Sequence, residues 1–295
     1  MTGVQVRLFP LLVAVLLLFP AAVRADGMRL ITIGAPVTEL AFALGAGDAV
    51  VGRDTVSRAP AEAAARPDVG YMRTLSAEGL MALAPTHVLA VEGAGPQAAF
   101  DQLRAMGVTV ETIPETRGRA GLPATIAAVA RALGRVAEGE RLAASVERDL
   151  SALAAAVDKA RAARTGTVGA RVLCLVGGGP GGMMAAGRGT VPDTLITLAG
   201  ARNAMDSDRD FAPLSAESAL AADPDILLVS QSFINRSGGL DSLLALPQLA
   251  MTPAARARRV VAVDGALLVG LGPRTPEAVT ALAAAQGVTV TGGTP

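Results

Sequence analysis

The sequence predicts an α/β protein with two lobes, each holding a parallel-type sheet flanked by helices, joined by one long connector helix. Three observations predict this fold. Apolar runs of strand length alternate with helical segments in both halves, which is typical of parallel sheets. A helix–strand unit occurs once in each half. Between the two copies, residues 124–164 show no strand pattern and can form a connector.

The repeated unit occupies residues 75–90 and 214–229, which read LSAEGLMALAPTHVLA and LSAESALAADPDILLV. Seven of the sixteen aligned positions are identical, including Leu-Ser-Ala-Glu and the proline. Ser76 and Ser215 can each cap the first turn of a short helix. The proline then ends that helix, and a strand-length apolar run follows. Recurrence of the unit indicates two halves of similar architecture.

The first half alternates strands and helices in order. Its predicted strands lie at 29–33, 50–53 and 108–113 and in the repeat, and its predicted helices at 37–44 and 97–106 and in the repeat. A polar loop over 54–68 leads to Tyr71. From Val136, an alanine-rich run favours a helix of about 28 residues, roughly 40 Å long.

The second half begins with a strand at 171–176, where the only cysteine, Cys174, is expected to be buried, and continues with a glycine-rich loop over 177–182. Further strands are predicted at 226–229 and 260–263, with others at 267–271 and 288–291, and helices from 190 or 193 to 199 and at 240–244, 253–258 and 275–286. The predicted division is 1–25 signal peptide, 26–122 N-terminal lobe, 123–166 connector and 167–295 C-terminal lobe.

Residues 1–25 have the pattern of a secretory signal peptide. Arg7 supplies a positive charge, an apolar run of about twelve residues follows, and Val23 and Ala25 stand at the positions that precede cleavage. An uncleaved membrane anchor is the alternative. We expect export to the periplasm and a mature chain that does not span the membrane.

Composition excludes several function classes. The formal net charge is 0 and no basic tract occurs, which argues against nucleic acid as a partner. The single histidine, His87, falls in a predicted strand and cannot build a zinc or manganese site alone. The glycine-rich loop contains a proline and lacks a phosphate-binding lysine, so a flexible lip over a ligand is the better interpretation. The sequence contains no G-x-S-x-G motif, which argues against a serine hydrolase.

Tyr71 is the only tyrosine of the chain. A phenolate is a hard anionic donor and one of the side chains that bind haem iron. Arg73, two residues further on, can stabilise that anion. A packed ring with a bonded hydroxyl is the alternative interpretation of Tyr71.

The sequence resembles the periplasmic substrate-binding proteins that serve importers of haem, siderophores and vitamin B12, and it is most similar to the haem-binding members. The resemblance covers nearly the whole mature chain. It is carried by Gly70-Tyr71-Met72-Arg73 with Leu75-Ser76-Ala77-Glu78-Gly79, by Glu92-Gly93-Ala94-Gly95-Pro96, by Ala186-Gly187-Arg188-Gly189-Thr190, by Pro213-Leu214-Ser215-Ala216-Glu217 and by Gly272-Pro273-Arg274-Thr275.

The resemblance implies a monomeric, non-enzymatic carrier that holds ferric haem b between its lobes. Tyr71 would be the axial iron ligand and Arg73 its neighbour. Some relatives add a histidine from the second lobe, where this chain instead has Met183 and Met184 in the glycine-rich segment. Arg188 is a further candidate, because arginine forks match the two haem propionates.

The resemblance also implies that Glu78 and Glu217, at equivalent places in the repeat, dock on a dimeric ABC transporter permease. Their simpler interpretation is favourable placement in the first turn of a helix. A corrinoid or ferric-siderophore carrier of the same class is the alternative function, and a secreted α/β hydrolase is the alternative from another class.

Overall fold

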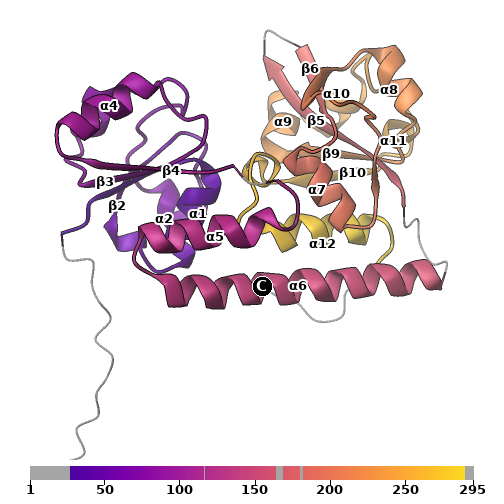
Figure 1. Ribbon diagram of the computed structural model, residues 1–295. Helices are drawn as coiled ribbons and strands as arrows, with labels where there is room; N and C mark the ends of the chain where they lie inside the picture. Colours follow the sequence, from indigo (N-terminus) through magenta and orange to yellow (C-terminus); the bar gives the residue numbers. More distant parts are fainter. Residues whose placement is uncertain (1–26, 116, 164–168, 180–181, 290–295) are drawn as a thin grey trace, which may run out of the picture.

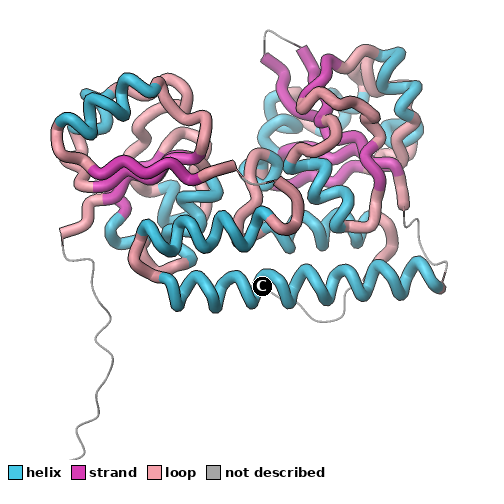
Figure 2. Tube along the Cα trace, viewed as in Figure 1, coloured by secondary structure: helices cyan, strands magenta, loops and turns pink. Residues whose placement is uncertain are grey.

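The computed structural model describes residues 27–115, 117–163, 169–179 and 182–289, so the predicted signal peptide lies outside the described residues. Two α/β lobes stand side by side above one long helix, α6 (Val136–Ala162), which runs beneath both of them (Figure 1). Strands occupy the centre of each lobe and helices surround them (Figure 2). The predicted boundaries of the lobes stay predictions, and the one at 122/123 falls inside helix α5 (Gly121–Ala132).

The N-terminal lobe contains a four-stranded sheet with the order β2-β1-β3-β4, and all its pairs are parallel. Its strands are β1 (Leu30–Ile33), β2 (Val50–Arg53), β3 (His87–Val91) and β4 (Thr109–Ile113). Its helices are α1 (Ala35–Ala43), α2 (Ala61–Ala64), α3 (Ala77–Met81) and α4 (Gln97–Ala105), and η1 (Gly47–Ala49) is a 3-10 turn. The carboxyl ends of all four strands therefore meet at one edge of the sheet, where ligands bind in open α/β folds.

The C-terminal lobe contains a six-stranded sheet in the order β10-β9-β5-β6-β8, with β7 beside β5. The strands are β5 (Arg171–Gly179), β6 (Gly182–Ala186), β7 (Arg202–Asn203), β8 (Phe211–Pro213), β9 (Ile226–Ser230) and β10 (Val260–Val263). Strands β5, β9 and β10 correspond to predicted strands and are parallel, and so is the short β7, which the sequence does not predict; the pairs β5–β6 and β6–β8 are antiparallel. Residues 177–179 and 182 of the expected glycine-rich lip are therefore in strands β5 and β6, and 180–181 lie outside the described residues.

The remaining helices cover this second sheet and the connector. They are α7 (Val191–Leu198), α8 (Ala216–Ala222), α9 (Gln231–Arg236), α10 (Leu240–Leu244), α11 (Pro253–Arg256) and α12 (Thr275–Ala285). One continuous core joins the lobes: buried residues of α1, α5, α6, α7 and α12 and of both sheets pack in a single cluster, with Leu40, Ile126, Leu150, Leu195 and Val279 among its members. The lobes are therefore fixed to each other by apolar packing as well as by chain connectivity.

Two strand predictions in the last part of the chain are wrong. Residues 265–268 form a 3-10 turn, η2 (Gly265–Leu268), because the Asp264 carboxylate accepts a hydrogen bond from the Ala266 amide at 3.0 Å and caps the turn. Val288 and Thr289 are not in a strand, and 290–291 lie outside the described residues. By contrast, Cys174 is fully buried within β5, as predicted.

Both copies of the repeat fold as predicted. Ser76 accepts a hydrogen bond from the Gly79 amide at the start of α3, and Ser215 accepts one from the Ser218 amide at the start of α8, each at 3.0 Å. Each short helix leads into an inner strand, β3 in one sheet and β9 in the other. The repeat thus places equivalent helix–strand units in the two lobes.

Candidate functional site

A cavity of about 310 Å³ lies between the two lobes, and we call it the cleft. The N-terminal lobe lines it with residues 34–36, 56, 71–73, 91–92, 113–115, 117 and 125, and the C-terminal lobe with 190–192, 210–211 and 268–271. Many of the first set follow the carboxyl ends of β1, β3 and β4. Its volume is within the usual range for small-molecule sites, and its lining is mainly apolar with a few charged groups, as such sites require.

Tyr71, the predicted iron ligand, is one of the residues that line this cleft. Its side chain is 46% exposed, which is high for an aromatic residue. Within the described residues, nothing forms a hydrogen bond with its hydroxyl; only its backbone carbonyl is engaged, accepting from the Thr74 amide at 2.9 Å. The alternative of a packed ring with a bonded hydroxyl is therefore not what the structure contains.

The backbone that carries Tyr71 is held firmly. Gly70 has φ of 100°, a left-handed conformation that favours glycine. Its amide donates to Asp68 at 2.8 Å, and Asp68 also accepts from the Thr55 hydroxyl at 3.0 Å and pairs with Arg53 at 2.7 Å. Burial acts to raise the pKa of Asp68, but these hydrogen bonds and the arginine outweigh it and lower that pKa. The ionised carboxylate thus ties the loop to the end of β2.

A buried carboxyl group holds the backbone of Gly34, which lines the cleft. Asp54 is fully buried, accepts a hydrogen bond from the Gly34 amide at 2.9 Å and bonds the Ser57 hydroxyl. Burial raises the pKa of Asp54. A side chain at Gly34 would meet Val91 at 2.5 Å, and Gly34 has φ of 97°. These contacts fix the start of α1, which forms one wall of the cleft.

The second predicted site residue, Arg73, also lines the cleft and is exposed. Among the described residues it has neither a hydrogen bond nor an ion pair, so its guanidinium is available to a ligand. From the opposite lobe, Phe211 and Val269 reach the cleft with 43% and 58% of their surfaces exposed. Large apolar side chains left in water at one place mark a binding surface.

Three predicted site residues do not line the cleft. Arg188 is exposed and pairs with Asp206 at 2.6 Å and Asp208 at 2.7 Å. Met183 is 8% exposed and packs in the core of the C-terminal lobe, because alternate residues of β6 face that core. Met184, on the other face of β6, is half-buried and lies opposite Pro213 of β8.

The structure adds a residue that sequence reasoning missed. Arg117 lines the cleft from the segment between β4 and α5, and its two terminal nitrogens donate to the two oxygens of Asp210, both at 2.9 Å. The pair joins the two lobes across the cleft. A contact between loops 93 residues apart leaves no signal in a single sequence.

Glu78 and Glu217 are both exposed and occupy the first turns of α3 and α8. Neither lines the cleft. Their positions agree with the favourable placement of acids at helix N-termini, and they leave both carboxylates accessible to a partner.

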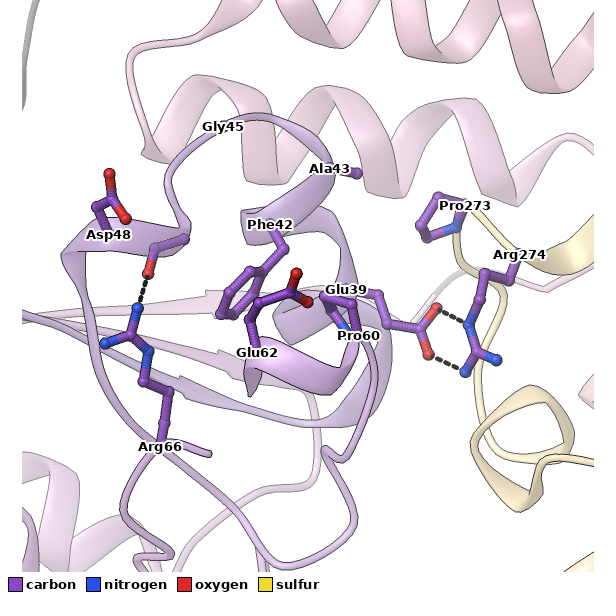
Figure 3. Close-up of a pocket in the computed structure, with 11 residues that line it drawn as sticks. Glu39, Phe42, Ala43, Gly45, Asp48, Pro60, Glu62, Arg66, Pro273 and Arg274 are labelled. Carbon is purple, nitrogen blue, oxygen red and sulfur yellow. Dashed lines mark hydrogen bonds and ion pairs between the residues drawn. The ribbon is translucent and has the colours of Figure 1, made fainter. Parts of the chain in front are cut away.

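A larger cavity of about 600 Å³ lies elsewhere on the lobe boundary, between α1, α2 and the start of α12 (Figure 3). Its wall includes Glu39, which is 5% exposed and accepts two hydrogen bonds from Arg274, at 2.6 and 3.1 Å. Arg274 also bonds Asp264 at 2.8 Å. Tyr71 is not part of this cavity. The main charged feature of this larger cavity is the Glu39–Arg274 ion pair, whose members already bond each other, so the cleft is the better candidate site.

Other kinds of site are not found in the described part of the chain. The described residues contain no group of three or more histidine, cysteine, aspartate or glutamate side chains that can hold a metal ion. His87 is half-buried at the start of β3, beside the Thr86 hydroxyl at 2.9 Å. Over the same residues, none of the helices is both long and apolar enough to cross a bilayer.

Comparison with known proteins places this geometry in context. A sequence model of the family described as periplasmic binding protein matches residues 30–267. A periplasmic heme-binding protein, RhuT of Roseiflexus sp. RS-1, superimposes with a TM-score of 0.80 at 41% identity, over 88% of this chain and 99% of that one. A periplasmic heme-binding protein of Pseudomonas aeruginosa gives 0.81 at 32% identity, over 88% and 92%. The predicted two-lobe α/β fold is confirmed.

Relatives among curated sequences have a different described ligand. A vitamin B12-binding protein of Pectobacterium atrosepticum is 25% identical over 214 residues, which are 72% of this chain and 75% of that protein. A vitamin B12-binding protein of Yersinia pestis is 36% identical over 106 residues, 35% of this chain and 38% of that protein.

Proposed function

The chain belongs to the periplasmic binding protein family, and from this premise we propose that it carries ferric haem in the cleft and delivers it to an ABC transporter. The observation that carries the proposal is Tyr71, whose hydroxyl has no partner among the described residues and which lines a largely apolar cleft between two lobes. Two solved structures with 32% and 41% identity are heme-binding proteins, which supports the same ligand. Membership of a family of binding proteins confirms the expectation that the chain is not an enzyme.

The chemistry of the cleft suits haem. Ferric iron favours an anionic oxygen ligand, and tyrosine is an established ligand of haem iron. Arg73 can stabilise the phenolate or pair with a propionate. The porphyrin faces would contact the apolar lining, including Phe211 and Val269. Since Met183 and Met184 lie outside the lining, we propose Tyr71 as the protein's iron ligand without a methionine partner.

Titration with haemin, followed by visible absorption, tests the proposal. The wild-type protein should bind with a phenolate-to-iron charge-transfer band. Tyr71→Phe keeps the ring and should lose this band, with binding weakened by at least about tenfold, as for loss of a charged hydrogen bond or more. His87→Ala is the matched control, because histidine is also a common ligand of haem iron and His87 lies outside the cleft lining. An unchanged band in Tyr71→Phe would contradict the assignment.

A corrinoid carrier is the second candidate, and the similarity to vitamin B12-binding proteins favours it. A titration of the same protein with cobalamin separates the two. The haem proposal expects saturation by haemin and no comparable binding of cobalamin. The opposite order of affinities would favour the corrinoid.

The proposal extends to partner and location. We place the protein in the periplasm, as its family implies, acting as a monomer. The exposed Glu78 and Glu217 would contact basic pockets on the two subunits of the permease. Their equivalent positions in the repeat support this arrangement, because a two-fold permease offers two equivalent sites. Two weak contacts on one rigid body reinforce each other through effective concentration.

A further inference from the structure

The cross-cleft pair of Arg117 and Asp210 is an ion pair without an evident structural purpose. The lobes are already joined by the shared core and by the Glu39–Arg274 pair. Arg117 and Asp210 are 48% and 50% exposed, and surface pairs of this kind contribute little to stability. Yet their geometry is bidentate, with both oxygens of one carboxylate bound by one guanidinium.

Both members are charged near neutral pH. The hydrogen bond and charge of Asp210 raise the pKa of Arg117, and the hydrogen bond from Arg117 lowers the pKa of Asp210. Around them the cleft is rich in acids, since Glu92 and Glu115 also line it. Its only cations in the described lining are Arg73 and Arg117. Asp210 therefore pairs with one of the two guanidinium groups in the lining that can bind an anionic ligand.

A carboxylate on a ligand meets the same guanidinium with the same geometry. An arginine fork binds any carboxylate through two parallel hydrogen bonds, so an incoming group can replace Asp210 without rearrangement of Arg117. Because the existing pair is half-exposed, water can solvate Asp210 when it is released. The exchange keeps the number of charged hydrogen bonds constant.

We propose that Asp210 is an internal substitute for a ligand carboxylate: it holds Arg117 in the empty cleft and gives it up to a propionate of the bound porphyrin. This inference rests on the proposed function, and it identifies Arg117 as the residue that selects ligands with a free carboxylate. A porphyrin without one cannot release Arg117 from Asp210. Arg117 thus provides the discrimination, and Asp210 keeps Arg117 paired in the empty cleft at the cost of a slightly lower affinity for the carboxylate ligand.

The test compares haemin with haemin dimethyl ester, whose carboxylates are blocked, in four variants. Asp210→Asn removes the competitor and should tighten haemin binding about two- to fivefold, the range of an exposed ion pair. Arg117→Gln should weaken it roughly three- to tenfold. Asp210→Asn in the Arg117→Gln background should add nothing. Asp206→Asn, which breaks an exposed arginine pair outside the cleft lining, should behave as wild type.

None of these variants should change affinity for the ester by more than about twofold, the smallest effect expected of an exposed pair. Equal effects on haemin and its ester, or no effect of Asp210→Asn on haemin, would overturn the exchange while leaving the haem proposal intact. Failure of the wild-type protein to bind haemin at all would refute the haem proposal itself, so the two failures are distinguishable.

Discussion

Replacing Arg274 by methionine should destabilise the protein in a strongly pH-dependent way. The variant keeps an apolar stem but leaves the Glu39 carboxylate 5% exposed and without its two hydrogen bonds from Arg274. Breaking a buried pair by removing one partner costs about 3–5 kcal/mol. Burial already acts to raise the pKa of Glu39, and Arg274 opposes it, so removing Arg274 raises that pKa further.

Protonation of Glu39 sets an upper limit to this loss. A glutamate has an ordinary pKa of about 4.3, and each pH unit above this pKa adds about 1.36 kcal/mol to the free energy of protonating it. Neutralising the Glu39 carboxyl therefore costs about 3.7 kcal/mol at pH 7 and about 1 kcal/mol at pH 5. In the variant, the folded state binds a proton that the unfolded state releases. Its stability is therefore retained at low pH and is lost as the pH rises above about 4.3.

Unfolding in guanidinium chloride, followed by far-ultraviolet circular dichroism at pH 5 and pH 7, measures the effect. We expect one transition, because both lobes share a core. Arg274→Met should lose about 3 kcal/mol at pH 7 and about 1 kcal/mol at pH 5. Glu39→Gln is the control. Arg274 keeps its hydrogen bond to Asp264 in this variant, so the unfolding free energy should fall by about 1 kcal/mol at both pH values. Equal losses in the two variants, or a loss for Arg274→Met that does not change with pH, would refute this reasoning.

Three further predictions concern the cleft and the docking surface. Phe211→Ala should weaken haemin binding about two- to tenfold in an absorption titration, because it removes an aromatic contact, and should leave the charge-transfer band unchanged. Asp68→Asn should remove a component of stability that is present above about pH 3.9 and lost as the pH falls below it, so unfolding free energies of variant and wild type should converge in acid; convergence at neutral pH instead would contradict this. Glu78→Arg combined with Glu217→Arg should leave haemin affinity intact and reduce delivery to a reconstituted transporter, and normal delivery would show that both residues serve only their helices.

Local signals in the sequence were sufficient for much of the fold. The Ser76 and Ser215 caps depend on a hydroxyl and an amide three residues apart, so they were readable without tertiary information. Tyr71 and Arg73 were found for the same reason, since a distinctive residue combination marked their loop. Both line the cleft, and their role toward haem and its iron stays a prediction.

Features that depend on distant partners were not predictable. Strands β6 and β8 contain glycine, alanine and proline, which have weak strand preference, and they are held by pairing with neighbours. Arg117 becomes a cleft residue only because Asp210 lies opposite it in the fold. Arg188 was expected in the site from its motif, but two nearby aspartates hold it at the surface.

The continuous core of α1, α5, α6, α7 and α12 has a consequence for the timing of transport. A cleft whose walls are packed together exists before the ligand arrives, so little ordering entropy is lost on loading. The same packing opposes separation of the lobes, because separation would expose buried apolar surface. A partner that opened the cleft would have to work against this shared hydrophobic interior. Loading in free solution should therefore proceed without a change in the relative position of the lobes.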